Sequence, residues 1–77
     1  MSAELVAYLA RQLVDFPEAV RVDEVADGDG VLLRLHVAPP DVGKVIGRRG
    51  RIARALRTVV RASAARSAER VQLEIVG

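Results

Sequence analysis

The residues best suited to chemistry are two arginines set between two glycines, Gly47-Arg48-Arg49-Gly50. Apolar residues on both sides of this tetrapeptide follow helical spacing, which predicts that it joins two helices. Glycine permits positive φ and leaves room for a sugar-phosphate chain, while arginine guanidinium groups form paired hydrogen bonds to phosphate oxygens. The tetrapeptide therefore predicts a tight turn that binds phosphate.

The segment from Lys44 to Arg66 concentrates positive charge. It holds eight of the twelve basic residues and none of the ten acidic ones, so the rest of the chain, with four basic and ten acidic residues, carries a net charge of −6. Arginines on a helix commonly form a solvated face with ion pairs, but this segment contains no acids that could pair with them. The charge separation favours a face that binds a polyanion.

The helix after the tetrapeptide is expected to have two faces, as judged from a helical projection. The expected buried face consists of Ile52, Leu56, Val59 and Ser63. The expected binding face consists of Arg51, Arg54, Arg57 and Arg61.

The size and composition of the chain limit its class. Seventy-seven residues predict a single domain over residues 1–77, and the absence of cysteine excludes disulfides, thiolate zinc sites and thiol redox chemistry. No signal peptide or membrane-spanning segment is recognisable, so we expect a cytoplasmic protein without membrane contact. The aromatic residues are Tyr8 and Phe16, which we expect in or beside the core. Because neither lies near the basic segment, RNP-motif, OB-fold and cold-shock proteins, which stack bases on aromatic platforms, are disfavoured.

Hydrophobic periodicity predicts six elements. Residues 2–14 are expected to form a helix, 20–26 and 31–38 two strands joined by a turn at 27–30, and 71–76 a final strand. The two helices around the tetrapeptide lie between the second and third strands, so the order is α-β-β-α-α-β. The expected buried stripe of the first helix consists of Leu5, Val6, Leu9 and Leu13.

These elements predict an α+β fold with a three-stranded mixed sheet. Right-handed crossover places the third strand parallel to the second, and the hairpin places the first antiparallel to it. All three helices are then expected on one face of the sheet.

The run from Val45 to Ile52, between two helices of a β-α-α-β unit, resembles the signature of a KH domain. The additional helix and strand precede that unit, an order similar to the type II arrangement. More narrowly, the run Asp41–Arg57, with Leu13-Val14-Asp15 and Pro17 upstream, is similar to the small bacterial single-KH proteins of the KhpA family. The resemblance covers essentially the whole chain.

The resemblance implies that the turn and its flanking helices hold about four nucleotides of single-stranded RNA against an apolar groove. Gly47 and Gly50 would shape the turn, and Arg48 and Arg49 would bind phosphate. The RNA-binding residues expected in this way are Val42, Lys44, Val45, Ile46, Gly47, Arg48, Arg49, Gly50, Arg51 and Arg54. Low sequence specificity and a role as a post-transcriptional regulator or RNA chaperone follow as expectations. The resemblance also implies a homodimer, or a heterodimer with a larger Jag-type KH protein, acting in cell division and envelope growth.

Two other functions are compatible with the same residues. A protein-interaction module could keep the KH shape and act as a dimer or adaptor, and a single-stranded DNA binder could use the same phosphate contacts. An enzyme is disfavoured because the chain has one histidine, His36, and no serine or carboxylate placed beside a base. We expect no cofactor, and we expect His36 to be a solvated or hydrogen-bonded strand residue.

Overall fold

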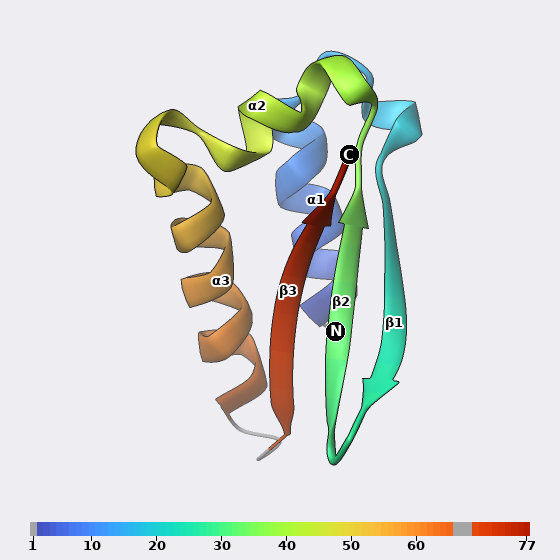
Figure 1. The fold of residues 1–77 in the computed structure, drawn as a ribbon, viewed down its shortest axis with the longest axis vertical. Coiled ribbons are helices and arrows are strands. Elements are labelled where there is room, and N and C mark those ends of the chain that lie inside the picture. Colours follow the sequence, from blue (N-terminus) through green and yellow to red (C-terminus); the bar gives the residue numbers. More distant parts are fainter. Residues whose placement is uncertain (1, 66–68) are drawn as a thin grey trace.

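A computed structural model describes residues 2–65 and 69–77, and this part of the chain forms three α-helices and a three-stranded sheet (Figure 1). The helices and strands are α1 (Ser2–Leu13), β1 (Arg21–Asp27), β2 (Gly30–His36), α2 (Val42–Ile46), α3 (Arg51–Ala64) and β3 (Arg70–Val76). Single turns of 3-10 helix lie at Pro17–Ala19 (η1), Pro39–Asp41 (η2) and Arg48–Gly50 (η3). The predicted order of elements is confirmed, with small shifts at their ends.

The sheet has the strand order β1-β2-β3. β1 pairs with β2 antiparallel, with Val25 opposite Leu32, and β2 pairs with β3 parallel, with Leu33 opposite Leu73. The two-residue hairpin turn accounts for the first pairing and the long crossover through α2 and α3 for the second. The predicted α+β fold with a mixed sheet is therefore confirmed.

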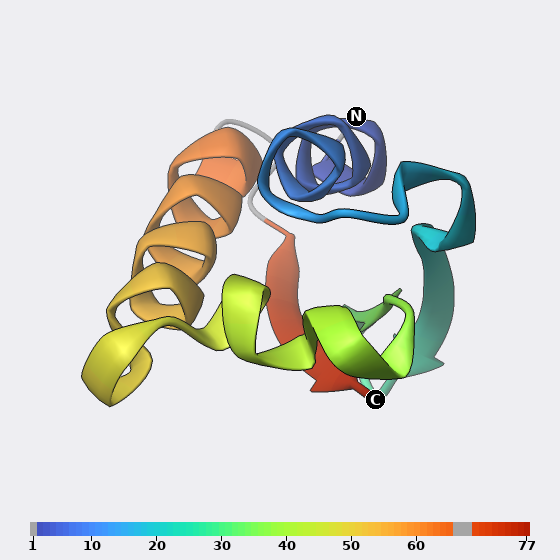
Figure 2. The same ribbon diagram turned by 90° about the horizontal axis from the view of Figure 1, so that it is seen from above.

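The helices form a second layer against the sheet. α1 and α3 run in opposite directions along the same face, and the short α2 crosses the end of the sheet where β2 and β3 stop (Figures 1 and 2). The core between the layers includes Val6, Ala10, Leu33, Leu35, Val45, Leu56 and Val60. The opposite face of the sheet carries ion pairs such as Arg34 to Glu74, at 3.0 Å.

The predicted buried stripe of α1 is only partly right. Val6 is fully buried, but Leu5 and Leu13 are each 37% exposed, and Ala7 and Ala10 are buried in their place. Alanines on the contact line let the helix axis approach the sheet closely, so the larger leucines lie at the sides of the contact. A prediction from the size of the hydrophobic side chains alone therefore placed the wrong residues of α1 in the core.

The predicted buried face of α3 is wrong by about one position. The structure buries Ala53, Leu56, Val60 and Ala64, while Ile52 and Val59 are half-buried and Ser63 is exposed. Two alanines again lie on the contact line. The resulting rotation of the helix turns Arg57 towards β3 and away from the face on which it was expected.

The two aromatic residues are more exposed than predicted. Tyr8 is 59% exposed, because α1 contacts the sheet through its small residues, and Phe16, which follows α1, is 45% exposed. His36 lies on the outer face of the sheet with its Nε2 3.0 Å from Asp23 Oδ2, although the geometry is not that of a hydrogen bond. The contact is therefore an ion pair only when the ring is protonated.

None of the helices in residues 2–65 and 69–77 has the length and apolar character needed to cross a bilayer. The same residues contain no group of three or more His, Cys, Asp or Glu side chains placed to hold a metal ion.

Candidate nucleic-acid interface

The turn from Gly47 to Gly50 has an unusual backbone. Positive φ occurs at Gly47 (77°), Arg49 (57°) and Gly50 (72°), and Arg49 is the one described non-glycine residue with this conformation. Gly47, with ψ of 175°, lies in a region that essentially only glycine adopts, and a Cβ there would also collide with the Ile52 side chain. Gly50 has open space around it and needs glycine only for its φ. The turn is closed by a 3.1 Å hydrogen bond from the Gly50 N–H to the Gly47 carbonyl.

The arginines of the turn are directed to solvent. Arg48, Arg49 and Arg51 are exposed, and the Arg54 guanidinium donates a 3.1 Å hydrogen bond to the Arg49 carbonyl. Arg54 thus links the first turns of α3 to the residue with the least favourable φ. Alternation of right- and left-handed residues directs neighbouring N–H groups to one side, which favours anion binding.

A groove of about 570 Å³ runs from the turn along the space between α3 and β3. Its lining includes Ile46, Gly50, Ala53, Arg57, Leu73, Ile75, Leu32, Gln72 and Glu74. Apolar side chains from α2, α3 and β3 therefore lie beside the basic turn. This combination can hold bases against the apolar surface while phosphates lie on the arginines.

The sequence-predicted residues of α2 occupy different environments. Ile46 is 38% exposed and lines the groove. Val45 is fully buried and supports the groove from behind, and Val42 is half-buried beside Gly77. The structure thus brings Ile46 together with the turn but places Val42 and Val45 outside the lining of the groove.

Lys44 belongs to a joint between α1 and α2. Its Nζ lies 3.1 Å from Asp15 Oδ2 and 3.5 Å from Asp41 Oδ1. Asp41 is fully buried and accepts the backbone N–H groups of Asp15, at 3.1 Å, and Phe16, at 3.0 Å. The joint therefore ties the segment after α1 to the start of α2.

The contacts within this joint shift the pKa values of Asp41 and Lys44. Burial acts to raise the pKa of Asp41, but the two N–H donors and Lys44 outweigh burial and hold this pKa below its usual value. The hydrogen bond to Asp15 raises the pKa of Lys44 above its usual value. Both groups are thus charged across the neutral range.

The basic residues of the turn and of α3 lack acidic partners. None of the ion pairs among the described residues involves Arg48, Arg49, Arg51, Arg54 or Arg61. Arg66, counted above in the basic segment, lies outside the described residues. Four unpaired guanidinium groups at the turn and the start of α3, with Arg61 about two helical turns further along, maintain a positive field that favours phosphate over neutral ligands.

Sequence reasoning missed most of the groove. Of its nine lining residues, only Ile46 and Gly50 were among the expected RNA-binding residues, and Arg57 was expected on the binding face of the helix. Ala53, Leu73 and Ile75 were read as parts of a helix or of the sheet and not as site residues. The alternation of 71–76 did predict that Leu73 and Ile75 share a face, but their position beside α3 depends on how the helix rotates against the sheet. The sequence predicted this rotation of α3 wrongly, by about one residue position.

Comparisons with known proteins give a consistent result. The family model described as "KhpA/KhpB, KH domain" matches residues 3–75. The chain is 56% identical over 77 residues to the RNA-binding protein KhpA of Treponema pallidum, covering 99% of this chain and 95% of that one. It is 51% identical over 73 residues to the RNA-binding protein KhpA of Clostridium perfringens, covering 95% and 97%.

A solved structure supports the fold. The crystal structure of a point variant of Aquifex aeolicus Era bound to GDP.AlF4- matches with a TM-score of 0.64 and 16% identity, covering 96% of this chain and 29% of that one. At this identity the likeness concerns the fold alone.

Proposed function

This chain belongs to the KhpA/KhpB KH-domain family, and from that premise we propose that it binds single-stranded RNA through the Gly47–Gly50 turn and the groove between α3 and β3. The observation that carries the proposal is the contrast within one surface: unpaired arginines lie around a turn with positive φ, directly beside an apolar groove. A strand can therefore place its phosphates on the turn and its bases in the groove. We propose that the protein binds RNA and does not catalyse a reaction.

We assign the predicted RNA-binding residues to different tasks. Arg48, Arg49 and Arg51 bind phosphate, and Ile46 borders the bases. Gly47 and Gly50 shape the turn, and Arg54 steadies it. Val42, Lys44 and Val45 hold α2 in position from outside the groove.

We propose that the groove holds about four nucleotides and discriminates little among bases. Five of its nine lining residues are aliphatic, and aliphatic side chains supply few groups that read base edges. We therefore expect affinity to depend mainly on phosphate contacts. Such a protein suits post-transcriptional regulation or RNA chaperone activity on many transcripts.

The decisive experiment replaces both arginines of the turn. Arg48→Asp combined with Arg49→Asp should weaken binding to a short RNA by more than about a hundredfold, while the melting temperature stays within a few degrees because both side chains are exposed. Arg11→Asp combined with Arg21→Asp makes the same charge change on α1 and β1 and should retain most of the affinity. Equal losses in the two variants would assign binding to net charge and not to the turn.

Salt dependence provides a second measurement of the same site. Three to five phosphate contacts at about 0.7 each predict a slope of log affinity against log salt of roughly −2 to −4. Scrambled sequences should bind within about tenfold of one another. A matched DNA strand in the same titration separates RNA binding from binding of single-stranded nucleic acid in general.

Exposed apolar residues on and after α1 favour association with another protein. Leu5, Tyr8, Leu13 and Phe16 are each more than a third exposed. We propose a homodimer, with a larger Jag-type KH protein as the alternative partner in control of cell shape. Two coupled grooves would raise affinity for a strand of a dozen or more nucleotides far above that for four. Sedimentation equilibrium of the wild type and of Leu5→Glu with Tyr8→Glu tests this association, and a strict monomer at high micromolar concentration would contradict it.

A further inference from the structure

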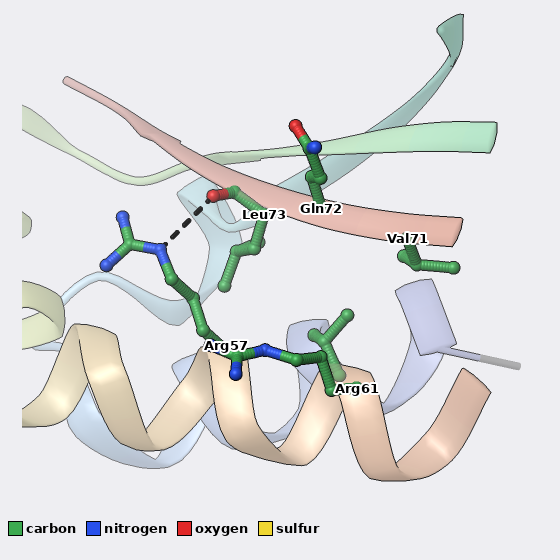
Figure 3. A pocket seen from close by; sticks show the side chains of 6 residues that line it. Arg57, Arg61, Val71, Gln72 and Leu73 are labelled. Carbon is green, nitrogen blue, oxygen red and sulfur yellow. Dashed lines mark hydrogen bonds between the residues drawn. The ribbon is translucent and has the colours of Figure 1, made fainter. Parts of the chain in front are cut away.

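The groove beside the turn continues past Arg57 into a second hollow. This second pocket has a volume of about 240 Å³ and is lined by Arg57, Val60, Arg61, Val71, Gln72 and Leu73 (Figure 3). Arg57, Gln72 and Leu73 also line the first groove. The two hollows therefore share a wall and follow one another along α3 and β3.

Arg57 lies at the boundary between them. Its Nε donates a hydrogen bond to the Leu73 carbonyl at 3.5 Å, across the space between α3 and β3 (Figure 3). This distance is long for such a bond, so the guanidinium can exchange the carbonyl for a stronger acceptor at little cost. A phosphate between the two hollows would be such an acceptor.

The second pocket repeats the chemistry of the first. Val60 and Val71 form an apolar wall, while Arg61 is exposed and has no acidic partner among the described residues. Arg61 follows Arg57 by one helical turn, a rise of about 6 Å along the axis. The second pocket thus again places a positive group beside an apolar surface, one helical turn further along α3.

The volume of the second pocket limits the size of the ligand that it can hold. Its volume is somewhat below the lower limit of about 300 Å³ for sites that enclose drug-sized ligands. It accommodates one ring system and not a larger cofactor. The cationic lining selects an anionic ligand, and the shared wall with the RNA groove selects a continuation of the same strand.

We propose that this pocket is an additional nucleotide subsite, used when an RNA strand extends beyond the groove at the Gly47–Gly50 turn. Arg61 binds the phosphate of the additional nucleotide, and Val71 borders its base. Arg57 leaves the Leu73 carbonyl and binds the phosphate between the two subsites. This inference rests on the proposed function, because it assumes that the first groove holds RNA.

Binding to strands of different length tests the subsite. Fluorescence anisotropy would compare a four-nucleotide oligouridylate with six-nucleotide strands, the added nucleotides being placed at either end. In the wild type, one of the two extensions should raise affinity about fivefold or more and steepen the salt slope by about 0.7 to 1.4, for one or two added phosphate contacts at Arg61 and Arg57. Titration to one strand per protein chain confirms that the gain occurs within a single groove and not between two copies.

Arg61→Gln should remove this gain while leaving affinity for the four-nucleotide strand within about twofold. Arg11→Gln makes the same charge change on α1 and should keep the gain. NMR spectra provide a second readout, in which the amide signals of Val71 and Gln72 shift with the six-nucleotide strand and much less with the shorter one. Arg61 is exposed, so the variant should fold, and its circular dichroism checks this.

The outcomes separate the two proposals. If neither strand binds the wild type, the proposed function fails. If the four-nucleotide strand binds but neither extension adds affinity, the second subsite is overturned and the proposed function stands. The subsite is likewise overturned if Arg61→Gln retains the full gain.

Discussion

Lys44 lies within ion-pair distance of two carboxylates, whereas Arg48 and Arg49, one turn later, have no acidic partner in the described part of the chain. The first region joins Lys44, within the five-residue helix α2, to Asp15 and Asp41, and the second region is the turn that follows α2. In the first region a buried carboxylate organises the charges, so the lysine contributes to the position of α2. In the second region the charges are left free and the backbone is bent, so the arginines remain available to a ligand. The comparison teaches that the partners of a cationic residue, and not its place in a basic segment, decide whether it holds the fold or stays available for the proposed RNA contacts.

The largest expected effect concerns the two glycines of the turn, tested by the same substitution at both. Gly50→Asn should destabilise the protein by no more than about 1 kcal/mol, because Gly50 has the left-handed conformation that asparagine tolerates and has open space around it. Gly47→Asn should cost about 3 kcal/mol, because it combines a glycine-only conformation with a collision against Ile52. Urea denaturation of both variants measures the difference.

RNA affinity should follow the same order, with Gly47→Asn impaired and Gly50→Asn close to the wild type at temperatures where both are folded. Equal stability of the two variants would show that the turn adapts freely. The bent backbone would then not be preorganised for phosphate binding. The turn would differ from the joint around Lys44 only in the partners of its charges.

A smaller effect separates the two cationic regions directly. Arg48→Met should weaken RNA binding about fivefold to tenfold and leave the melting temperature unchanged, since an exposed phosphate contact is lost. Lys44→Met should have the opposite profile, with a lower melting temperature and RNA affinity within about twofold, since it removes a counter-charge of buried Asp41. Calorimetry measures the melting temperature of both variants, and fluorescence anisotropy measures their RNA affinity. A large loss of affinity in Lys44→Met would show that Lys44 contacts the RNA.

Much of this arrangement could be predicted from the sequence. Alternation and turn residues located the strands, the tetrapeptide with its flanking helices located the bent turn, and charge separation located the basic side. These features are local, so a short stretch of residues determines each one. The order of elements and the parallel pairing of β3 then followed from the rules of chain connection.

The remaining features depend on packing between distant segments. The rotation of α3 is set by Ala53 and Ala64 against the sheet, and it moved Arg57 from the open face to the wall of the groove. Of the two partners of Lys44, Asp41 lies only three residues earlier, but Asp15 belongs to the segment after α1 and is brought to Lys44 by the fold. Tyr8 shows the same limit, because Ala7 and Ala10 occupy the contact with the sheet that its aromatic size suggested for it.

The smallest expected effect is the pH dependence of the joint around Asp41. Its pKa is lower in the folded protein than the ordinary value of 3.8, so the folded state favours the ionised form. The resulting stabilisation is fully present above the pKa of the unfolded chain and is lost as pH falls through the lower folded value. Lys44 has a raised pKa, so its contribution is present below about 10 and is lost only in strong base. Between these limits the joint should be insensitive to pH.

As pH falls below the ordinary carboxyl value of 3.8, the wild-type melting temperature should therefore decline more steeply than that of Asp41→Asn, which has no charge to lose at this position. Asp23 also has a lowered pKa, mainly through its hydrogen bond with Arg21, and titrates in the same range. Asp23→Asn is the matched control. Because the side chain of Asp23 is 43% exposed whereas that of Asp41 is fully buried, the loss of the Asp23 charge should change the decline less. Equal slopes in the wild type and Asp41→Asn would mean that the buried carboxylate is no better stabilised than in the unfolded chain. The contrast between a charge-paired joint and an unpaired turn would then rest on the arginines alone.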